Sequence, residues 1–214
     1  MDIYNFLMQV LIYAPSVIFA ITLHEAAHGY VAKHFGDTTA YMLGRVTLNP
    51  LKHIDPIGTI VVPLLTAFTG FIFGWAKPVP VNFHNLRHPK RDMLWVAAAG
   101  PGSNIVQALI WAFVAKVLFD MQGPVATYWF QVAEGGILVN LILAILNLFP
   151  ILPLDGGRIL ASLLPARVSY AYQGTERFGM IILVLLIVSG VLGWLMRPVL
   201  VACITAIYAL FGLS

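Results

Sequence analysis

A long apolar run, from about residue 6 to residue 31, is the feature that most constrains how this chain can fold. About 20 such residues in a helix cross the hydrocarbon core of a membrane, so the run predicts a membrane-spanning helix. Within it lies the sequence His24-Glu25-Ala26-Ala27-His28. A charged side chain at the centre of a bilayer costs about 2.5 to 3.5 kcal/mol on insertion scales. A glutamate between two histidines inside lipid therefore indicates a functional site.

The spacing of these residues predicts part of a metal site. An α-helix turns about 100° per residue, so His24 and His28 lie on one face and can offer two imidazoles to one zinc ion. Glu25 points about a quarter-turn away, where it is a poor ligand but can take a proton from a water molecule that the metal activates. In a soluble helix the same three residues more often form a solvated face. The apolar flanks argue against that interpretation here.

The composition excludes an ordinary soluble domain. Hydrophobic residues make up 60% and charged residues 10% of the 214 residues, and the mean hydropathy is +0.88. Soluble domains have roughly 45 to 50% apolar and 25% charged residues. We therefore expect an all-α polytopic membrane protein, with a single membrane-embedded domain over residues 1–214. The net charge of +3 is small and bears on orientation in the membrane rather than on nucleic acid, so no nucleic-acid partner is expected.

Apolar stretches predict helices over residues 5–33, 93–118 and 128–149, followed by scaffold helices over residues 178–196 and 198–212. Residues 38–59 are polar, contain β-favouring side chains and are broken by glycine and proline, so they predict short strands and turns. Pro78 and Pro80 exclude a helix or a central strand, so residues 78–82 predict an edge strand.

Residues 57–73 are apolar but barely long enough to span, and they could cross the membrane or dip in and return. The basic residues favour the second alternative. If the segment returns, nearly all of them share one side, and only Lys116 and Arg197 lie opposite, as the positive-inside rule predicts. We therefore expect an outside N-terminus, five full spans and one re-entrant hairpin. That makes about five to six transmembrane segments, with the hairpin or short strands at the cytoplasmic face.

A third metal ligand is expected at the end of the third long helix, in the sequence Pro150-Ile151-Leu152-Pro153-Leu154-Asp155-Gly156-Gly157. Its prolines and glycines predict unwound backbone around Asp155. A zinc ion held by two histidines needs a third donor, and Asp155 is an acid in apolar sequence with the backbone freedom to supply it. The alternative is that Asp155 caps a helix over residues 157–164.

Residues 97–103 of the second long helix are a cluster of small residues that lets another helix approach closely. Asn104, next to the cluster, could hydrogen-bond across that contact or position substrate. Packing is the leading interpretation of the cluster.

Taken together, three motifs resemble the site-2 protease family of intramembrane zinc metalloproteases. They are His24-Glu25-x-x-His28, Ala99-Gly100-Pro101-x-x-Asn104, and Asn147-x-x-Pro150-x-x-Pro153-Leu154-Asp155-Gly156. The resemblance covers roughly residues 17–164 and implies a three-helix zinc core, with residues 176–214 as additional helices. It implies that His24, His28 and Asp155 bind Zn²⁺, that Glu25 activates water, and that Asn147 helps to stabilise the transition state.

The reaction so implied is hydrolysis of a peptide bond in or near a transmembrane helix of a membrane-protein substrate. A helix hides its carbonyls, so the substrate must unwind locally. Residues 79–82 could hold the unwound chain by adding a strand, with Asn82 as a further contact. The implied partners are that substrate and the lipid bilayer, and the implied location is the cell membrane, with the active site nearer the cytoplasm.

Two other functions use the same residues. A zinc-binding transporter or a metal-dependent membrane binding protein could employ these ligands, but the paired, broken halves that are typical of transporters are not visible. An inactive scaffold is disfavoured because every polar group that the chemistry needs is present. The sequence leaves open the substrate, its regulation, and whether the protein forms a homo-oligomer.

Overall fold

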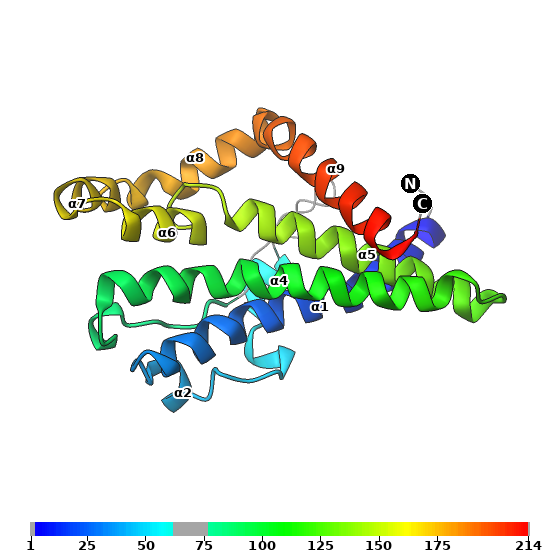
Figure 1. The fold of residues 1–214 in the computed structure, drawn as a ribbon, viewed down its shortest axis with the longest axis horizontal. Helices are drawn as coiled ribbons and strands as arrows, with labels where there is room; N and C mark the ends of the chain where they lie inside the picture. Colours follow the sequence, from blue (N-terminus) through cyan, green and yellow to red (C-terminus); the bar gives the residue numbers. More distant parts are fainter. Residues whose placement is uncertain (1–2, 62–76, 214) are drawn as a thin grey trace.

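The computed structural model describes residues 3–61 and 77–213, and every regular element within them is helical (Figure 1). The longer elements are α1 (Ile3–His34), α4 (Pro89–Phe119), α5 (Pro124–Asn147), α6 (Asp155–Leu163), α7 (Ala166–Gln173), α8 (Glu176–Val188) and α9 (Val191–Phe211). A single turn, α2 (Thr39–Met42), follows α1. The three predicted long helices are present. The first two are a few residues longer than predicted, and the third begins and ends a few residues earlier.

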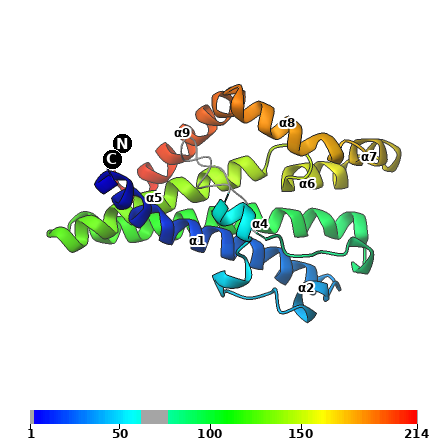
Figure 2. The ribbon, with the colours of Figure 1, turned by 180° about the vertical axis from the view of Figure 1, so that it is seen from behind.

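Four of these helices are long and apolar enough to cross a membrane: α1 from Leu7, α4, α5 and α9. The pair α7 and α8, bent by 62°, would make a fifth if it counts as one span. The chain is therefore a multi-pass membrane protein. Successive helices alternate in direction, and α8 with α9 leads back to the end where α1 begins, so both termini lie at one end (Figures 1 and 2). The described residues thus give four candidate spans, or five with the bent pair, where five full spans were predicted.

The predicted strands are wrong for the described residues, which contain none. Short helical turns replace them at Thr39–Met42 and Pro50–Lys52. Local side-chain bonds outweigh β propensity there: Asp37 accepts from the Thr39 N–H at 3.0 Å, and Asn49 accepts from the Leu51 N–H at 3.1 Å. Residues 77–82 are extended but form no ladder, because two of their N–H groups bond to carboxylates. Val79 donates to Glu25 and Asn82 to Asp37, both at 2.7 Å.

The C-terminal helices divide at Ser189 and Gly190, not at Arg197 as predicted. Gly190 has a φ of +75°, a left-handed conformation that glycine adopts without strain and that ends α8. Pro198 lies inside α9 instead of beginning a new helix. Proline is tolerated inside membrane helices, where neighbouring groups can satisfy the backbone that it frees.

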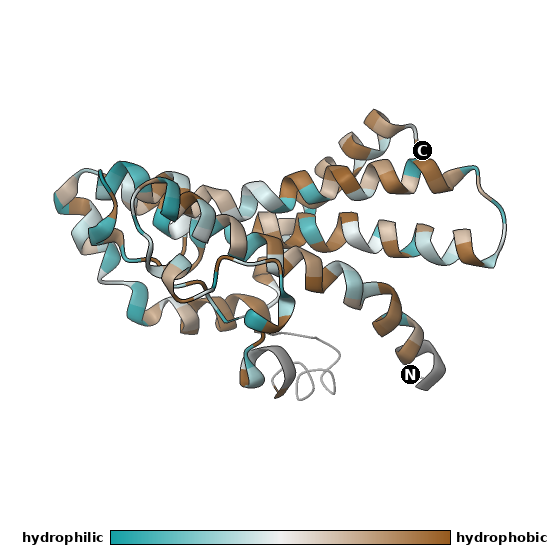
Figure 3. Ribbon diagram, turned by 90° about the horizontal axis from the view of Figure 1, so that it is seen from below, coloured by the Kyte–Doolittle hydropathy of each residue, from teal (hydrophilic) through white to brown (hydrophobic). Residues whose placement is uncertain are grey.

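Helices α4 and α5 form the centre of the molecule and pack through small side chains. The buried cluster contains alanines of both helices, with Ile137 and Leu141 of α5 and Ile207 of α9. Gly136 lets the Trp111 ring approach so closely that a Cβ there would lie 2.4 Å from it. Hydrophilic residues gather instead at the end of the molecule that carries α6, α7 and the loops after α1 (Figure 3).

The two loops that flank residues 57–76 lie side by side. Lys77 donates its N–H to the carbonyl of His53 at 2.9 Å, and Arg87 donates to that of Phe35 at 3.0 Å. The side chain of Asn85 donates to Thr39 at 3.2 Å. These contacts place the basic residues of both loops at one end, the arrangement that the charge distribution favours. The predicted membrane-dipping segment itself, residues 57–73, falls largely outside the described residues.

Asp37 joins these loops. Its side chain is fully buried and accepts hydrogen bonds from Thr39, from the Asn82 N–H and from the Asn85 side chain. Burial alone would raise the pKa of Asp37, but these bonds outweigh it and lower the pKa below its ordinary value. Asp37 therefore stabilises the fold above the pKa of an unfolded aspartate, and this contribution is lost as the pH falls through its lowered folded pKa.

We predict that Asp37→Asn lowers the free energy of unfolding at pH 7 by about 1 to 3 kcal/mol, because several hydrogen bonds to a charged group are weakened. The difference from the parent protein should shrink below about pH 4. Thermal unfolding in detergent at pH 7 and below pH 4 measures the difference in stability. The exposed Asp120→Asn is the control, and its stability should equal that of the parent protein at both pH values. Equal stability of Asp37→Asn and the parent at pH 7 would refute this role.

Candidate metal centre

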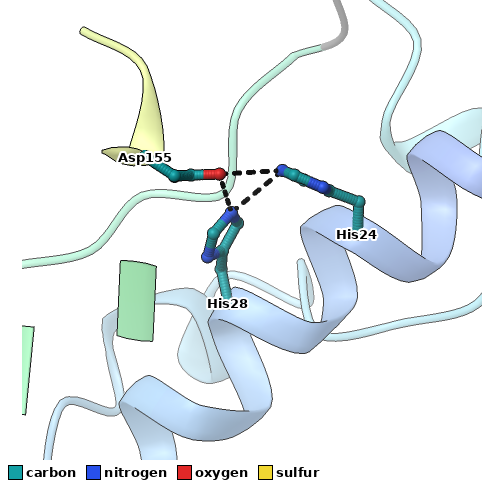
Figure 4. A group of neighbouring side chains, drawn as sticks. All are labelled: His24, His28 and Asp155. Atoms are coloured by element: carbon teal, nitrogen blue, oxygen red, sulfur yellow. Dashed lines mark hydrogen bonds and ion pairs between the residues drawn. The ribbon is translucent and has the colours of Figure 1, made fainter. Parts of the chain in front are cut away.

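Three side chains from two distant parts of the chain converge on one point (Figure 4). The Nε2 atoms of His24 and His28, on α1, lie 3.1 Å apart. The Oδ2 atom of Asp155, the first residue of α6, lies 3.2 Å from the first and 3.4 Å from the second. Tetrahedral zinc with bonds of about 2.0 to 2.1 Å holds its ligand atoms about 3.3 to 3.4 Å apart. The triangle therefore fits a zinc ion with one position left open.

The state of the Asp155 carboxylate also fits a metal ligand. Its Oδ2 atom is buried and makes no hydrogen bond of acceptable geometry, although two imidazole nitrogens lie within 3.4 Å. Burial would raise the pKa of Asp155, but the two imidazoles outweigh it and hold the pKa well below the usual range. A carboxylate binds a metal in its ionised form.

Two glycines allow Asp155 to reach α1. A Cβ at Gly156 would lie 2.3 Å from the Leu148 carbonyl oxygen, and one at Gly157 would lie 2.5 Å from the Leu152 nitrogen. The first turn of α6 therefore packs directly on the backbone that leaves α5. Unwinding was predicted around Asp155 itself. The unwound residues instead lie just before it, and Asp155 begins the helix.

Each histidine is oriented through its other ring nitrogen. His28 Nδ1 lies 2.7 Å from the Val96 carbonyl oxygen, which can only accept, so Nδ1 carries the proton. His24 Nδ1 lies 2.6 Å from Asn104 Oδ1. Such partners fix the tautomer and leave both Nε2 atoms free for a metal.

Asn104 is itself held by a buried network. Its amide donates to the Ala20 carbonyl at 3.2 Å and to Asn140 Oδ1 at 2.9 Å, and Asn140 donates to the Gly136 carbonyl. Asn104 thus lies behind His24 and hydrogen-bonds across the contacts of α4 with α1 and α5, as predicted from the sequence. Substrate positioning by Asn104 stays a prediction. Asn140 was missed altogether. The available signal was an asparagine in the middle of an apolar helix, where an unpaired amide would be costly.

Gly100 explains why α4 carries small residues where it passes His24 and His28. A Cβ there would lie 2.4 Å from His28 Nε2 and 2.6 Å from His24 Nε2. The backbone of α4 therefore forms one wall of the centre, and the small-residue cluster makes room for the imidazoles as well as for helix packing.

The other predicted residues lie around this centre in different ways. Glu25 is half-buried, and its Oε2 atom accepts the Val79 N–H at 2.7 Å. Asn147, the last residue of α5, donates its amide to the Leu143 carbonyl of its own helix at 3.0 Å. Asn82 is exposed, and its Oδ1 atom caps the turn Phe83–Asn85 by accepting from the His84 N–H at 3.1 Å. The structure does not bring Asn82 to the three converging side chains.

Comparison with known proteins agrees with this geometry. The sequence model of peptidase family M50 matches residues 119–190 of this chain. YwhC of Bacillus subtilis, whose name describes a zinc metalloprotease, is 38% identical over 201 residues, which cover 92% of this chain and 89% of that protein. The chain belongs to peptidase family M50. Rip2 of Mycobacterium tuberculosis, named in the same way, is 30% identical over 91% of this chain and 71% of its own length. No solved protein structure matches the chain.

Membership of family M50 confirms the resemblance to site-2 proteases and identifies the protein as a zinc metalloprotease with Zn²⁺ as its cofactor. It does not favour the alternative of a transporter or a metal-dependent binding protein.

We predict that Gly100→Ala weakens zinc binding roughly tenfold or more, because the new methyl group would displace both imidazoles. Gly102→Ala is the matched control: it lies on the same helix, and nothing lies within 4 Å of its added Cβ. Zinc content after equilibration with a graded chelator measures the difference. Equal zinc retention by the two variants would show that α4 does not border the metal.

Proposed function

We propose that this M50 metalloprotease hydrolyses a peptide bond in or near a transmembrane helix of a membrane-protein substrate. The observation that carries the proposal is the convergence of His24, His28 and Asp155 within 3.4 Å of one another between helices that are apolar enough to span lipid. These three residues would hold the zinc ion.

When bound, zinc polarises the scissile carbonyl and makes a water molecule a better nucleophile. Glu25, next to His24, takes the proton from that water and passes it to the leaving amine. The Val79 N–H orients its carboxylate by binding Oε2 and leaves Oε1 for the proton. Asn147 stabilises the negative charge on the carbonyl oxygen by donating a hydrogen bond, which requires its amide to turn away from Leu143.

Residues 77–82 border this proton-transferring group and are held in place from several sides. Arg45 donates to the carbonyls of Lys77 and Pro78 at 2.9 and 3.4 Å. Because the N–H groups of Val79 and Asn82 are already used and Pro80 has none, a substrate strand could pair mainly with the Val81 N–H and nearby carbonyls. Strand addition here would therefore be short, and Asn82 would support it through the turn that it caps.

The location follows from charge. We place the catalytic end towards the cytoplasm of the cell membrane, because the basic loops after α1 lie at that end. Residues 1–214 would act as a single membrane-embedded domain, with residues 17–164 as its catalytic core and a transmembrane protein and the bilayer as its partners.

We predict that Glu25→Gln retains zinc but slows cleavage about 10²- to 10⁴-fold, because it keeps the shape of the side chain and removes the proton acceptor. Glu176→Gln, the same change at an exposed acid that faces Arg158, should leave the rate unchanged. The assay measures cleavage by the purified protein in liposomes of a set of peptides that each span the membrane once. Soluble peptides that contain the same cleavage regions are tested for comparison. Full activity of Glu25→Gln, or cleavage of soluble peptides alone, would contradict the proposal.

A further inference from the structure

A second polar site lies in the half of the molecule away from the metal centre. A cavity of about 390 Å³ is bordered by α1, α5 and α9 near the end that holds both termini. Its lining includes Gln9 and Tyr13 of α1, Gln131 and Glu134 of α5, and Tyr208 of α9. A carboxylate inside a predicted membrane helix calls for an explanation of its own.

Glu134 has no cationic partner among the described residues. The hydroxyl group of Tyr208 donates to its Oε1 atom at 3.1 Å, and no ion pair of the described chain includes it. Lys116, a basic residue towards the same end of the molecule, donates to the Gly212 carbonyl at 3.3 Å instead. Glu134 is half-buried, and this one neutral hydrogen bond leaves its charge without a partner of opposite sign. A cation from outside the chain would supply what is missing.

The depth of the cavity indicates where that cation comes from. Tyr13, which lines it, precedes His24 by eleven residues on one helix, a separation of about 16 Å along the helix axis and so across the membrane. Tyr208 lies three residues before the end of α9. Exposed Tyr13 and Trp129 occupy the same end, as aromatic side chains do where lipid headgroups meet the hydrocarbon core. Gln9 and Gln131 are exposed, so the cavity opens towards the surrounding lipid.

We propose that this cavity binds the ammonium group of a phospholipid, as in the headgroup of phosphatidylethanolamine. A primary ammonium has three N–H donors and one positive charge. Glu134 would accept a charged hydrogen bond, and the amide oxygens of Gln9 and Gln131, which line the same cavity, would accept the remaining N–H groups. The bound lipid would join α1 to α9 on the side of the molecule opposite the metal.

The test is native mass spectrometry of the purified protein in detergent with equal amounts of phosphatidylethanolamine, phosphatidylcholine and phosphatidylglycerol. We expect the parent protein to retain phosphatidylethanolamine preferentially and Glu134→Gln to lose that preference about tenfold. Asp120→Asn, an exposed acid at the same end of the molecule, is the matched control and should keep it. Tyr208→Phe, which leaves the carboxylate in place, should retain the preference for the ammonium headgroup.

Thermal unfolding and zinc content, measured in parallel, show whether each variant is folded. Equal retention of the three lipids by the folded parent protein would overturn the proposal, as would an unchanged preference in folded Glu134→Gln. If Glu134→Gln instead alters only the cleavage of substrates with a basic residue near this level, the cavity receives substrate rather than lipid, and the proposal is likewise wrong. Because lipid retention is measured without cleavage, its outcome is independent of the proposed proteolytic function.

Discussion

Two imidazoles and a carboxylate that are buried among apolar helices must find their partners inside the protein, because lipid offers none. This requirement connects most of the fold. His28 is oriented by the Val96 carbonyl, and His24 is oriented by Asn104. Asn104 in turn ties α1 and α4 to Asn140 on α5. The tight turn between α5 and α6 then delivers Asp155. A zinc ion would complete this set by neutralising the Asp155 carboxylate, whose buried Oδ2 atom lacks a hydrogen bond.

The loops complete the other side of the centre. They are polar and carry no regular strand among the described residues, yet they are held by specific bonds to carboxylates. Asp37 fixes the residues after α1 against Asn82 and Asn85, and Glu25 fixes Val79. The residue proposed to move protons is thus bound to the segment proposed to meet substrate. Movement of residues 77–82 would therefore change the position of the Glu25 carboxylate directly.

The sequence predicted the helical class, the three long helices and the three residues that converge, because each depends on local pattern. Histidines four apart share a helix face whatever surrounds them, and Asp155 stood out among prolines and glycines. The sequence did not predict Asn140 behind Asn104, the contact of Val79 with Glu25, or the cavity at Glu134. Each of these depends on which helices and loops meet, and one apolar helix surface resembles another. The predicted strands failed because side-chain bonds from Asp37, Asn49 and Glu25 satisfy the backbone locally.

X-ray absorption spectroscopy of the metal in the purified protein tests the central claim most directly. The account predicts one zinc ion per chain with only nitrogen and oxygen neighbours at about 2.0 to 2.2 Å and the outer-shell scattering of two imidazoles. It also predicts loss of tightly bound zinc in Asp155→Ala. A sulfur neighbour at about 2.3 Å, or an unchanged spectrum at full occupancy in Asp155→Ala, would contradict it.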